Sequence, residues 1–184
     1  MQEDAILWER IDAPGHDACR LARCGSGWDV SGTAVFAHNA KPACLRYQVT
    51  CDRDWRTIDG SIFGWCGSQA VAAHFRHTPE GSWTMNERAI DLLADCVDLD
   101  FSFTPATNIF QIRRLALAVG ERAVVPVAWF DLEADGLQRL SQTYQRVSDD
   151  TYAYAAPSVP YAAELEVNPS GFVRTYPGLW QQCA

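Results

Sequence analysis

The feature that most constrains the fold of this 184-residue chain is the alternation of apolar and polar side chains with a period of two. In the segment 45–50 every second residue is apolar, and the residues between them are polar. The segment 161–167 repeats the pattern, with glutamates at two of the polar positions. Because successive side chains of a strand point to opposite faces, this pattern predicts half-buried strands and an antiparallel, mainly β fold.

Turn residues between such segments predict hairpins. The run Asn-Pro-Ser-Gly at 168–171 separates the segment 161–167 from a second strand-like segment, 172–176. We expect a further hairpin between 70–77 and 82–85, which a Thr-Pro-Glu-Gly turn separates. Asn, Pro, Ser and Gly each favour tight turns, so both connections are predicted to be short.

Two more strands are predicted at 32–38 and 124–130, which are rich in β-branched and aromatic residues. Pro126 makes the second of these an edge or bulged strand, since proline cannot donate to a ladder. The run Gly-Ser-Gly at 25–27 is interpreted as a hairpin turn and not as a phosphate cradle, because no helix pattern follows it.

Helical spacing is less common. One helix is predicted to begin near Thr107 and Asn108, which can cap it, and to end at Gly120. A second helix is predicted by an apolar stripe at Leu137, Leu140, Tyr144 and Val147. The segment 86–96 is compatible with a helix or a strand. The predicted class is β-rich α+β with one or two short helices.

The length predicts a single β-rich domain over residues 1–184, because domains average about 150 residues. Fifteen basic residues against twenty-three acidic ones give a net charge of −8, which argues against a nucleic-acid partner. The composition, 48% hydrophobic and 21% charged, is typical of a globular protein and not of a disordered one.

Targeting and redox signals point to the cytoplasm. The first fifteen residues have neither the basic start nor the apolar run of a secretory signal. No apolar stretch approaches the roughly 18 residues of a membrane span, so we expect no membrane insertion. Seven cysteines, an odd number without a C-x-x-C pair, predict reduced thiols, neither a disulfide framework nor a zinc site.

Familiar catalytic motifs are missing from the sequence: it has no G-x-S-x-G, P-loop, H-E-x-x-H or dinucleotide-binding glycine pattern. His74 and His77 are three residues apart, so they fall on opposite faces of the predicted strand and cannot chelate one metal together. We therefore expect neither a metal nor a cofactor.

Acidic residues cluster at 91–100, and two of them fall in a predicted strand, 97–101. Asp98 and Asp100 would share one face of that strand. Two carboxylates in this arrangement are compatible with a general acid/base pair or a cation site. The alternatives are a solvated strand face and partners for nearby arginines.

Arg113 and Arg114 are adjacent among apolar neighbours. Adjacent residues of a helix or strand point in different directions, so one arginine is predicted to face inward. A buried charge needs a partner. That partner is either Asp98 or Asp100, or the polar head of a ligand held by the guanidinium fork.

At these residues the sequence resembles the family described as "Putative glycolipid-binding", formerly a domain of unknown function. The central signature comprises 96–100, 104–108 and 112–115, with one departure, Gln111 where proline is expected. Further agreement, which extends the resemblance over nearly the whole chain, comes from Gln142, Tyr144, Tyr152, Tyr154 and the run 176–180. Because proline is tolerated in the first turn of a helix, glutamine there should leave the fold intact.

The resemblance implies a curved antiparallel sheet or half-barrel around a hydrophobic cavity, similar to bacterial carriers of lipidated proteins and glycolipids. With the aromatic surplus, the inward strand faces and the polar cluster, the leading hypothesis is a non-catalytic binding protein for a small amphipathic ligand, a glycolipid or a fatty-acyl compound. Those carriers are exported, whereas no export signal is seen in this chain, so transport across an envelope is not expected.

Twenty-one aromatic residues support a ring-lined cavity. The candidate ligand-binding residues are Trp65, Trp129, Tyr154 and Tyr176 as the lining, and Asn108 with Arg113 or Arg114 at the polar head. For each ring the alternative is simple core packing.

Two other functions stay open. One is a small sugar- or lipid-modifying enzyme that uses Asp98 or Asp100 as its general base. The other is a self-associating module, a homodimer that closes an exposed apolar surface without any small ligand.

Overall fold

In the computed structural model, which describes residues 2–134 and 136–183, neighbouring strands pair into one sheet. Within these residues the order across the sheet is β8-β7-β6-β5-β4-β3-β2-β1-β15-β14-β13-β12-β11-β10-β9. The strands are β1 (Asp4–Arg10), β2 (Gly15–Cys24), β3 (Gly27–His38), β4 (Lys41–Cys51), β5 (Thr57–Cys66), β6 (Gln69–His77), β7 (Trp83–Met85), β8 (Arg88–Ile90), β9 (Asp98–Phe101), β10 (Arg122–Phe130), β11 (Leu137–Arg146), β12 (Thr151–Ala156), β13 (Tyr161–Val167), β14 (Val173–Tyr176) and β15 (Trp180–Gln182). A helix, α1 (Asn108–Leu115), lies between β9 and β10 in the chain.

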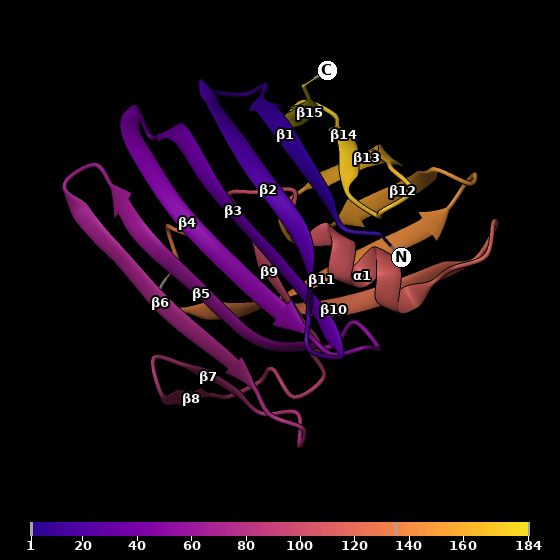
Figure 1. Ribbon diagram of the computed structural model, residues 1–184, viewed down its shortest axis with the longest axis horizontal. Helices are drawn as coiled ribbons and strands as arrows, with labels where there is room; N and C mark the ends of the chain where they lie inside the picture. Colours follow the sequence, from indigo (N-terminus) through magenta and orange to yellow (C-terminus); the bar gives the residue numbers. More distant parts are fainter. Residues whose placement is uncertain (1, 135, 184) are drawn as a thin grey trace.

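The sheet is strongly curved. In Figure 1 the indigo to magenta strands β1 to β6 form one wall, and the orange and yellow strands β10 to β13 cross behind α1 as the other. Each described pair is antiparallel except β9 with β10, which is parallel. In the described part of the chain β8 and β9 stay unpaired with each other, so the sheet is open. The mainly β fold predicted above is confirmed.

The two ends of the chain join the walls. β1 pairs with β15, so that Trp8 lies opposite Gln182 and Arg10 opposite Trp180. Trp8 is fully buried, and its indole Nε1 donates to the Val173 carbonyl oxygen at 2.6 Å. A buried indole with a satisfied N–H both fills space and fixes the orientation of the ring. The first and last strands are therefore fastened to each other in the middle of the sheet.

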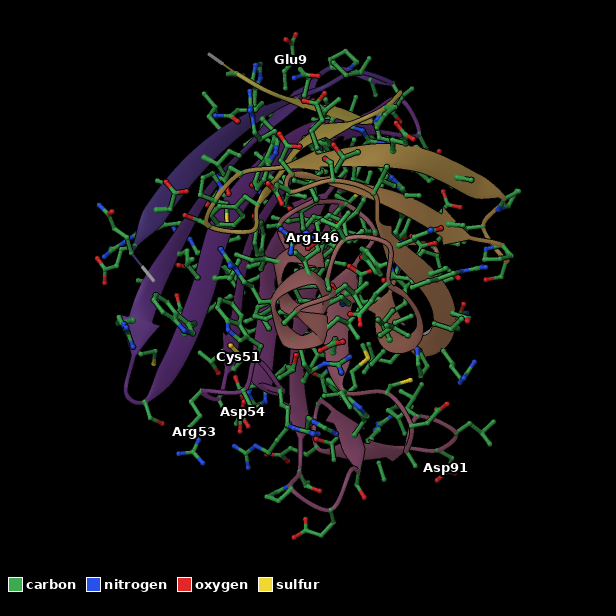
Figure 2. The ribbon with its side chains drawn as sticks, turned by 90° about the vertical axis from the view of Figure 1, so that its right-hand side faces the viewer. Glu9, Cys51, Arg53, Asp54, Asp91 and Arg146 are labelled. Carbon is green, nitrogen blue, oxygen red and sulfur yellow. The ribbon has the colours of Figure 1, made fainter. Side chains whose placement is uncertain are left out.

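β9 and α1 lie inside the curve. All four residues of β9 are buried although it is an edge strand. Its Leu99 N–H donates to the Thr57 hydroxyl of β5 at 3.1 Å, so β9 approaches the opposite wall. Leu99 and Phe101 pack in one apolar cluster with β1 to β6, while Ile112 of α1 packs in a second with β10 to β14. Figure 2 shows side chains filling the space around the helix.

The predicted hairpins are present. β13 and β14 pair across the turn at 168–171, and β6 and β7 pair across 78–82. Gly25 (φ 57) occupies the turn between β2 and β3. Pro126 pairs with Ser141 of β11, and the pairing of β10 with β9 begins one residue later, at Val127. The missing N–H thus falls where the strand has a neighbour on one side only.

The helix is shorter than predicted. Thr107 does occupy the N-cap position, but α1 ends at Leu115 instead of Gly120. Ala116 adopts a left-handed conformation (φ 44), and its N–H donates to the Ile112 carbonyl, which closes the last turn. Gly120 (φ 92) serves instead the turn that leads into β10. Within the described residues no helix is long and apolar enough to cross a bilayer.

The predicted second helix, over 137–147, is wrong: this segment forms β11. The apparent helical spacing arises because β11 is buried on both faces at its start. Leu137 packs in the first apolar cluster, and Leu140 packs in the second. Beyond that point the burial alternates, but the inward residue between Leu140 and Tyr144 is the polar Gln142. Because Gln142 is polar although it is buried, the alternation of apolar and polar residues that marks a strand is not visible in this part of the sequence.

The segment 86–96, open between helix and strand, contains only the short β8 and turns. Asn86 (φ 50) and Glu87 (φ 66) form a two-residue loop between β7 and β8. Positive φ at both central residues is the geometry that fits the twist of a hairpin. Asn86 is therefore a turn residue and not a helix cap.

Candidate functional site: an aromatic cavity beside Asp100

The parallel pairing of β9 with β10 places the two central aspartates. Asp98 lies opposite Val127, and Asp100 opposite Trp129, on one face of the sheet. The shared face predicted for the two carboxyl groups is therefore present. The alternative of a solvated face is wrong, because Asp98 is 0% exposed and Asp100 is 6% exposed.

Asp98 is held by Arg114. Nε of Arg114 donates to Oδ1 of Asp98 at 2.9 Å, and Nη2 donates to Oδ2 at 2.6 Å. Burial raises the pKa of Asp98, and Arg114 acts against this rise. This two-point pair is the predicted inward arginine with its carboxylate partner. Both residues are committed to each other.

Asp100 is held by neutral donors alone among the described residues. The Thr107 hydroxyl donates to its Oδ1, and the Gln142 amide donates to its Oδ2 at 2.7 Å. The amide oxygen of Gln142 accepts from the Tyr144 hydroxyl at 3.2 Å, and that hydroxyl in turn accepts from Nδ2 of Asn108 at 2.7 Å. These buried groups form a continuous chain from α1 across β11 to β9. A satisfied network of this kind fixes each member in one orientation.

Burial decides the protonation of Asp100. It raises the pKa of this carboxyl to about 6, although the hydrogen bonds from Thr107 and Gln142 favour the charged form. The negative charge of Asp98 raises the pKa further. Asp100 is therefore a carboxyl group that changes charge just below neutral pH.

A cavity of about 260 Å³ lies against this network. Its aromatic lining comes from six strands and comprises Phe101, Trp129, Tyr154, Tyr161, Tyr176 and Trp180. Its polar lining comes from β9, α1 and the loop between them, and comprises Asp100, Ser102, Thr104 and Asn108. Val159, which is 38% exposed, also lines the cavity and marks the side that meets the solvent. The cavity thus has aromatic walls and one polar end.

Five of the nine candidate residues from the sequence come together here. Asn108, Trp129, Tyr154, Tyr176 and Asp100 all line the cavity. Two of the rings pack on each other: the Tyr154 and Tyr176 centroids are 5.7 Å apart in a T-shaped arrangement. Burial raises the pKa of Tyr154 and Tyr176 far above neutral pH, so both hydroxyls stay protonated.

Trp65 lies outside this site. It is 44% exposed, near the end of β5 and opposite Cys44 of β4. The inner face of β5 carries Gly60, where an added Cβ would lie 2.3 Å from Leu99 Cδ2, and Ile62, which is buried. The aromatic residues Phe63 and Trp65 alternate with that inner face and point outward. The assignment of Trp65 to the cavity lining is therefore corrected.

Arg113 and Arg114 do not line the cavity either. Nε of Arg113 donates to the Ser170 carbonyl oxygen at 2.8 Å, and Nη2 donates to that of Pro169. Arg113 therefore fastens the β13–β14 turn to the helix. Since Arg114 is paired with Asp98, the structure places no arginine of the pair at the polar end.

Sequence reasoning missed a further buried acid, in addition to Asp98 and Asp100. Asp17 of β2 is 0% exposed, and its Oδ2 accepts from the Tyr47 hydroxyl at 2.8 Å and from the Thr104 hydroxyl. Its Oδ1 has no partner among the described residues. Burial raises its pKa to about 6. The signal was an aspartate at an inward position of an alternating strand, 17–21, next to Cys19 and Leu21.

Gln142, Thr107, Tyr161 and Trp180 were also not assigned to a site. Gln142 and Trp180 are among the positions at which the sequence resembles the family, but their contacts depend on which strands become neighbours in the fold. His74 and His77 are separate, as predicted: His74 contacts Asp59 at 2.7 Å, and His77 stacks on Trp83. Among the described residues no group of three or more His, Cys, Asp or Glu could hold a metal.

Fold and site together define the class: an open β half-barrel with an interior helix and an aromatic cavity. The chain belongs to the family described as "Putative glycolipid-binding", whose model matches residues 5–182. The expected proline is replaced by Gln111, which is fully buried in an intact α1.

Two solved structures share the fold. A DUF1089 family protein from Pseudomonas aeruginosa is 26% identical, with a TM-score of 0.80 over 91% of each chain. A β-barrel-like protein of the DUF1849 domain of unknown function from Brucella abortus is 14% identical, with a TM-score of 0.54 over 98% of this chain and 92% of its own. The second likeness concerns the fold alone. No curated protein matches the sequence.

Proposed function

We propose that this protein binds the head group of a glycolipid-type ligand in the aromatic cavity and catalyses no reaction on it. The observation that carries the proposal is the lining itself, aromatic walls around one polar end whose groups are fixed by hydrogen bonds. Small-molecule sites combine such apolar walls with a few placed polar groups. The family's description is compatible with this ligand class.

The size of the cavity favours a head group over a whole lipid. Its volume, about 260 Å³, lies just below the roughly 300–1,000 Å³ of typical small-molecule sites. A sugar ring can lie against the faces of Trp129 and Tyr176, with its hydroxyls near Asn108. An attached alkyl chain would leave past Val159, at the solvent side.

The contacts of the two aspartates favour binding over catalysis. A general base needs a free lone pair within reach of the substrate proton. Asp98 is occupied by Arg114 and lies outside the cavity lining. Each oxygen of Asp100 is held in place by one side-chain hydrogen bond, and no histidine, lysine or cysteine is among the residues that line the cavity to act with it as a second acid or base.

Isothermal titration calorimetry with octyl β-D-glucopyranoside, below its micelle concentration, tests the proposal. We expect the wild-type protein to bind it, and Trp129→Ala to weaken binding at least tenfold, since central aromatic residues dominate binding energies. Trp65→Ala is the matched control, because it removes an indole outside the cavity. Equal losses in both variants, or none in either, would contradict this site, provided that circular dichroism shows both folded.

A further inference from the structure

The residues that line the cavity include an acidic group but no basic one. Among the residues that line it, Asp100 is the only one with a carboxyl group, and none is a lysine, arginine or histidine. The donors that hold Asp100 are a hydroxyl and an amide, both neutral. Once ionised, Asp100 therefore brings to the cavity a negative charge that the lining does not balance.

The arginines that could have balanced this charge are engaged elsewhere. Arg114 is bound to Asp98 through two nitrogens. The guanidinium of Arg10 lies 5.7 Å from the Trp180 ring, but it pairs with Asp12 at 2.7 Å and does not line the cavity. A buried, uncompensated charge is costly in an apolar environment, so a ligand that supplied the opposite charge would relieve that cost.

The walls favour the same sign of ligand charge. The Tyr161 and Tyr176 centroids are 5.1 Å apart, and Tyr154 lies 6.1 Å from Tyr161 and 5.7 Å from Tyr176. With Trp129 and Trp180 these rings surround the cavity. The face of an aromatic ring carries partial negative charge and attracts cations, quaternary ammonium groups in particular.

We propose that the head group bound in this cavity carries a positive charge, an ammonium group that lies between the aromatic walls and the carboxylate of Asp100. The inference rests on the proposed function, since it concerns the same cavity. Two sources share this chemistry, an amino sugar and a choline-like head. Fatty acids are excluded as preferred ligands, because their carboxylate would meet Asp100 without a neutralising arginine.

Four probes with the same octyl chain separate these possibilities at pH 7.5: octyl 2-amino-2-deoxy-β-D-glucopyranoside, octyltrimethylammonium, octyl β-D-glucopyranoside and octanoate. We expect at least one of the two cationic probes to bind the wild-type protein tenfold or more tightly than the neutral glucoside. Octanoate should bind most weakly. The amino sugar binding more tightly than the trimethylammonium identifies a sugar head, and the reverse order identifies a choline-like head.

Asp100→Asn keeps the shape of the side chain and removes its charge. In this variant the ratio between the affinities of the better cationic probe and the glucoside should fall to near one. Asp95→Asn is the control, because Asp95 is exposed, pairs with Arg139 and does not line the cavity. It should leave the ratio unchanged.

The outcomes separate the two proposals. If the glucoside binds the wild-type protein as tightly as both cationic probes, the ammonium inference fails and the proposed function stands. The inference also fails if octanoate binds most tightly, or if Asp100→Asn keeps the tenfold ratio. If no octyl probe binds, the proposed function fails. The order of the wild-type protein's affinities for the four probes tests the ammonium inference even if the Asp100→Asn variant does not fold.

Discussion

Arg114 near the end of α1 and Asp98 at the start of β9 form a two-point ion pair, with nitrogen-to-oxygen distances of 2.9 and 2.6 Å. The side chain of Asp98 is fully buried, and that of Arg114 is 20% exposed. The pair joins the interior helix to the interior strand. It also leaves Asp100, two residues further along β9, without a cationic partner among the described residues.

Arg114→Met is expected to destabilise the protein by about 3–5 kcal/mol, because it leaves the Asp98 carboxylate buried without a partner. Urea unfolding followed by circular dichroism measures this loss. Replacing both partners, as Arg114→Met with Asp98→Leu, should recover part of the stability, since no buried charge is then left. A double variant less stable than Arg114→Met would show that the ion pair does not account for the loss.

Arg113→Met serves as the comparison. Its side chain donates to two carbonyl groups of the β13–β14 turn and has no carboxylate partner among the described residues. We expect a loss of about 1–3 kcal/mol, as for hydrogen bonds of a charged donor. This loss exceeds the roughly 0.5 kcal/mol of unfolding free energy that is expected when a surface arginine without such contacts is replaced. Equal losses for the two single variants would contradict the different roles of the two arginines.

The sequence was sufficient to predict the elements whose whole pattern lies within one short segment. The hairpin 161–176 could be predicted because its alternation and its turn residues lie within one short segment. The same alternation placed Asp98 and Asp100 on one face. Wherever the information needed was the identity of a tertiary neighbour, the prediction stayed open or failed.

The strands β11 and β5 show why predictions that depend on tertiary neighbours failed. The helix predicted over 137–147 assumed that the segment buries one face, but β11 buries Leu137 in one apolar cluster and Leu140 in the other. Trp65 was assigned inward because it is large and apolar, but β5 presents Gly60 inward to make room for Leu99. Neither the second apolar cluster nor the position of β9 can be read from the alternation of a single strand.

Gly171→Ala tests the contact of the β13–β14 turn with α1. Gly171 has φ +96, and a Cβ there would lie 2.7 Å from Arg113 Nε and 3.2 Å from Ile109 Cγ1. We expect the strained backbone to lower the free energy of unfolding by about 1–3 kcal/mol, and the contact of the new Cβ with Arg113 and Ile109 to lower it further. Gly178→Ala is matched in conformation (φ +74) and meets nothing within 4 Å. Thermal unfolding measures both variants. If Gly171→Ala loses no more stability than Gly178→Ala, the turn can move to accommodate the added Cβ without cost.

All seven thiols are expected to be free, as the odd cysteine number and the sequence context predict. Titration with Ellman's reagent in denaturant, without reductant, should count seven. In the native protein the exposed Cys24 should react first, while Cys19, Cys51 and Cys96 are buried and should react slowly. Burial raises the pKa of Cys51 and of Cys96 to about 12, which suppresses the reactive thiolate. Fewer than seven thiols in fresh protein would reveal a disulfide.

Asp17 gives the protein a dependence of stability on pH that can be isolated by substitution. Burial raises its pKa to about 6 from 3.8, so between these values the folded protein binds a proton that the unfolded chain has released. The stabilisation is present below pH 4 and is lost as the pH rises through 6, by about 3 kcal/mol. Asp100, with its pKa also raised to about 6 by burial, adds a loss of the same sign.

Asp17→Asn removes the titrating group, so the unfolding free energy of this variant minus that of the wild-type protein should rise by about 3 kcal/mol between pH 4 and pH 7. Urea unfolding at several pH values measures this difference. Asp95→Asn is the control: Arg139 lowers the pKa of the exposed Asp95, so its difference should change little and in the opposite direction. A difference for Asp17→Asn that stays constant from pH 4 to pH 7 would mean that the carboxyl group is already ionised at pH 4. In that case the unpartnered Oδ1 would have to be reached by water, because an ionised carboxylate needs solvation that Tyr47 and Thr104 supply only to Oδ2.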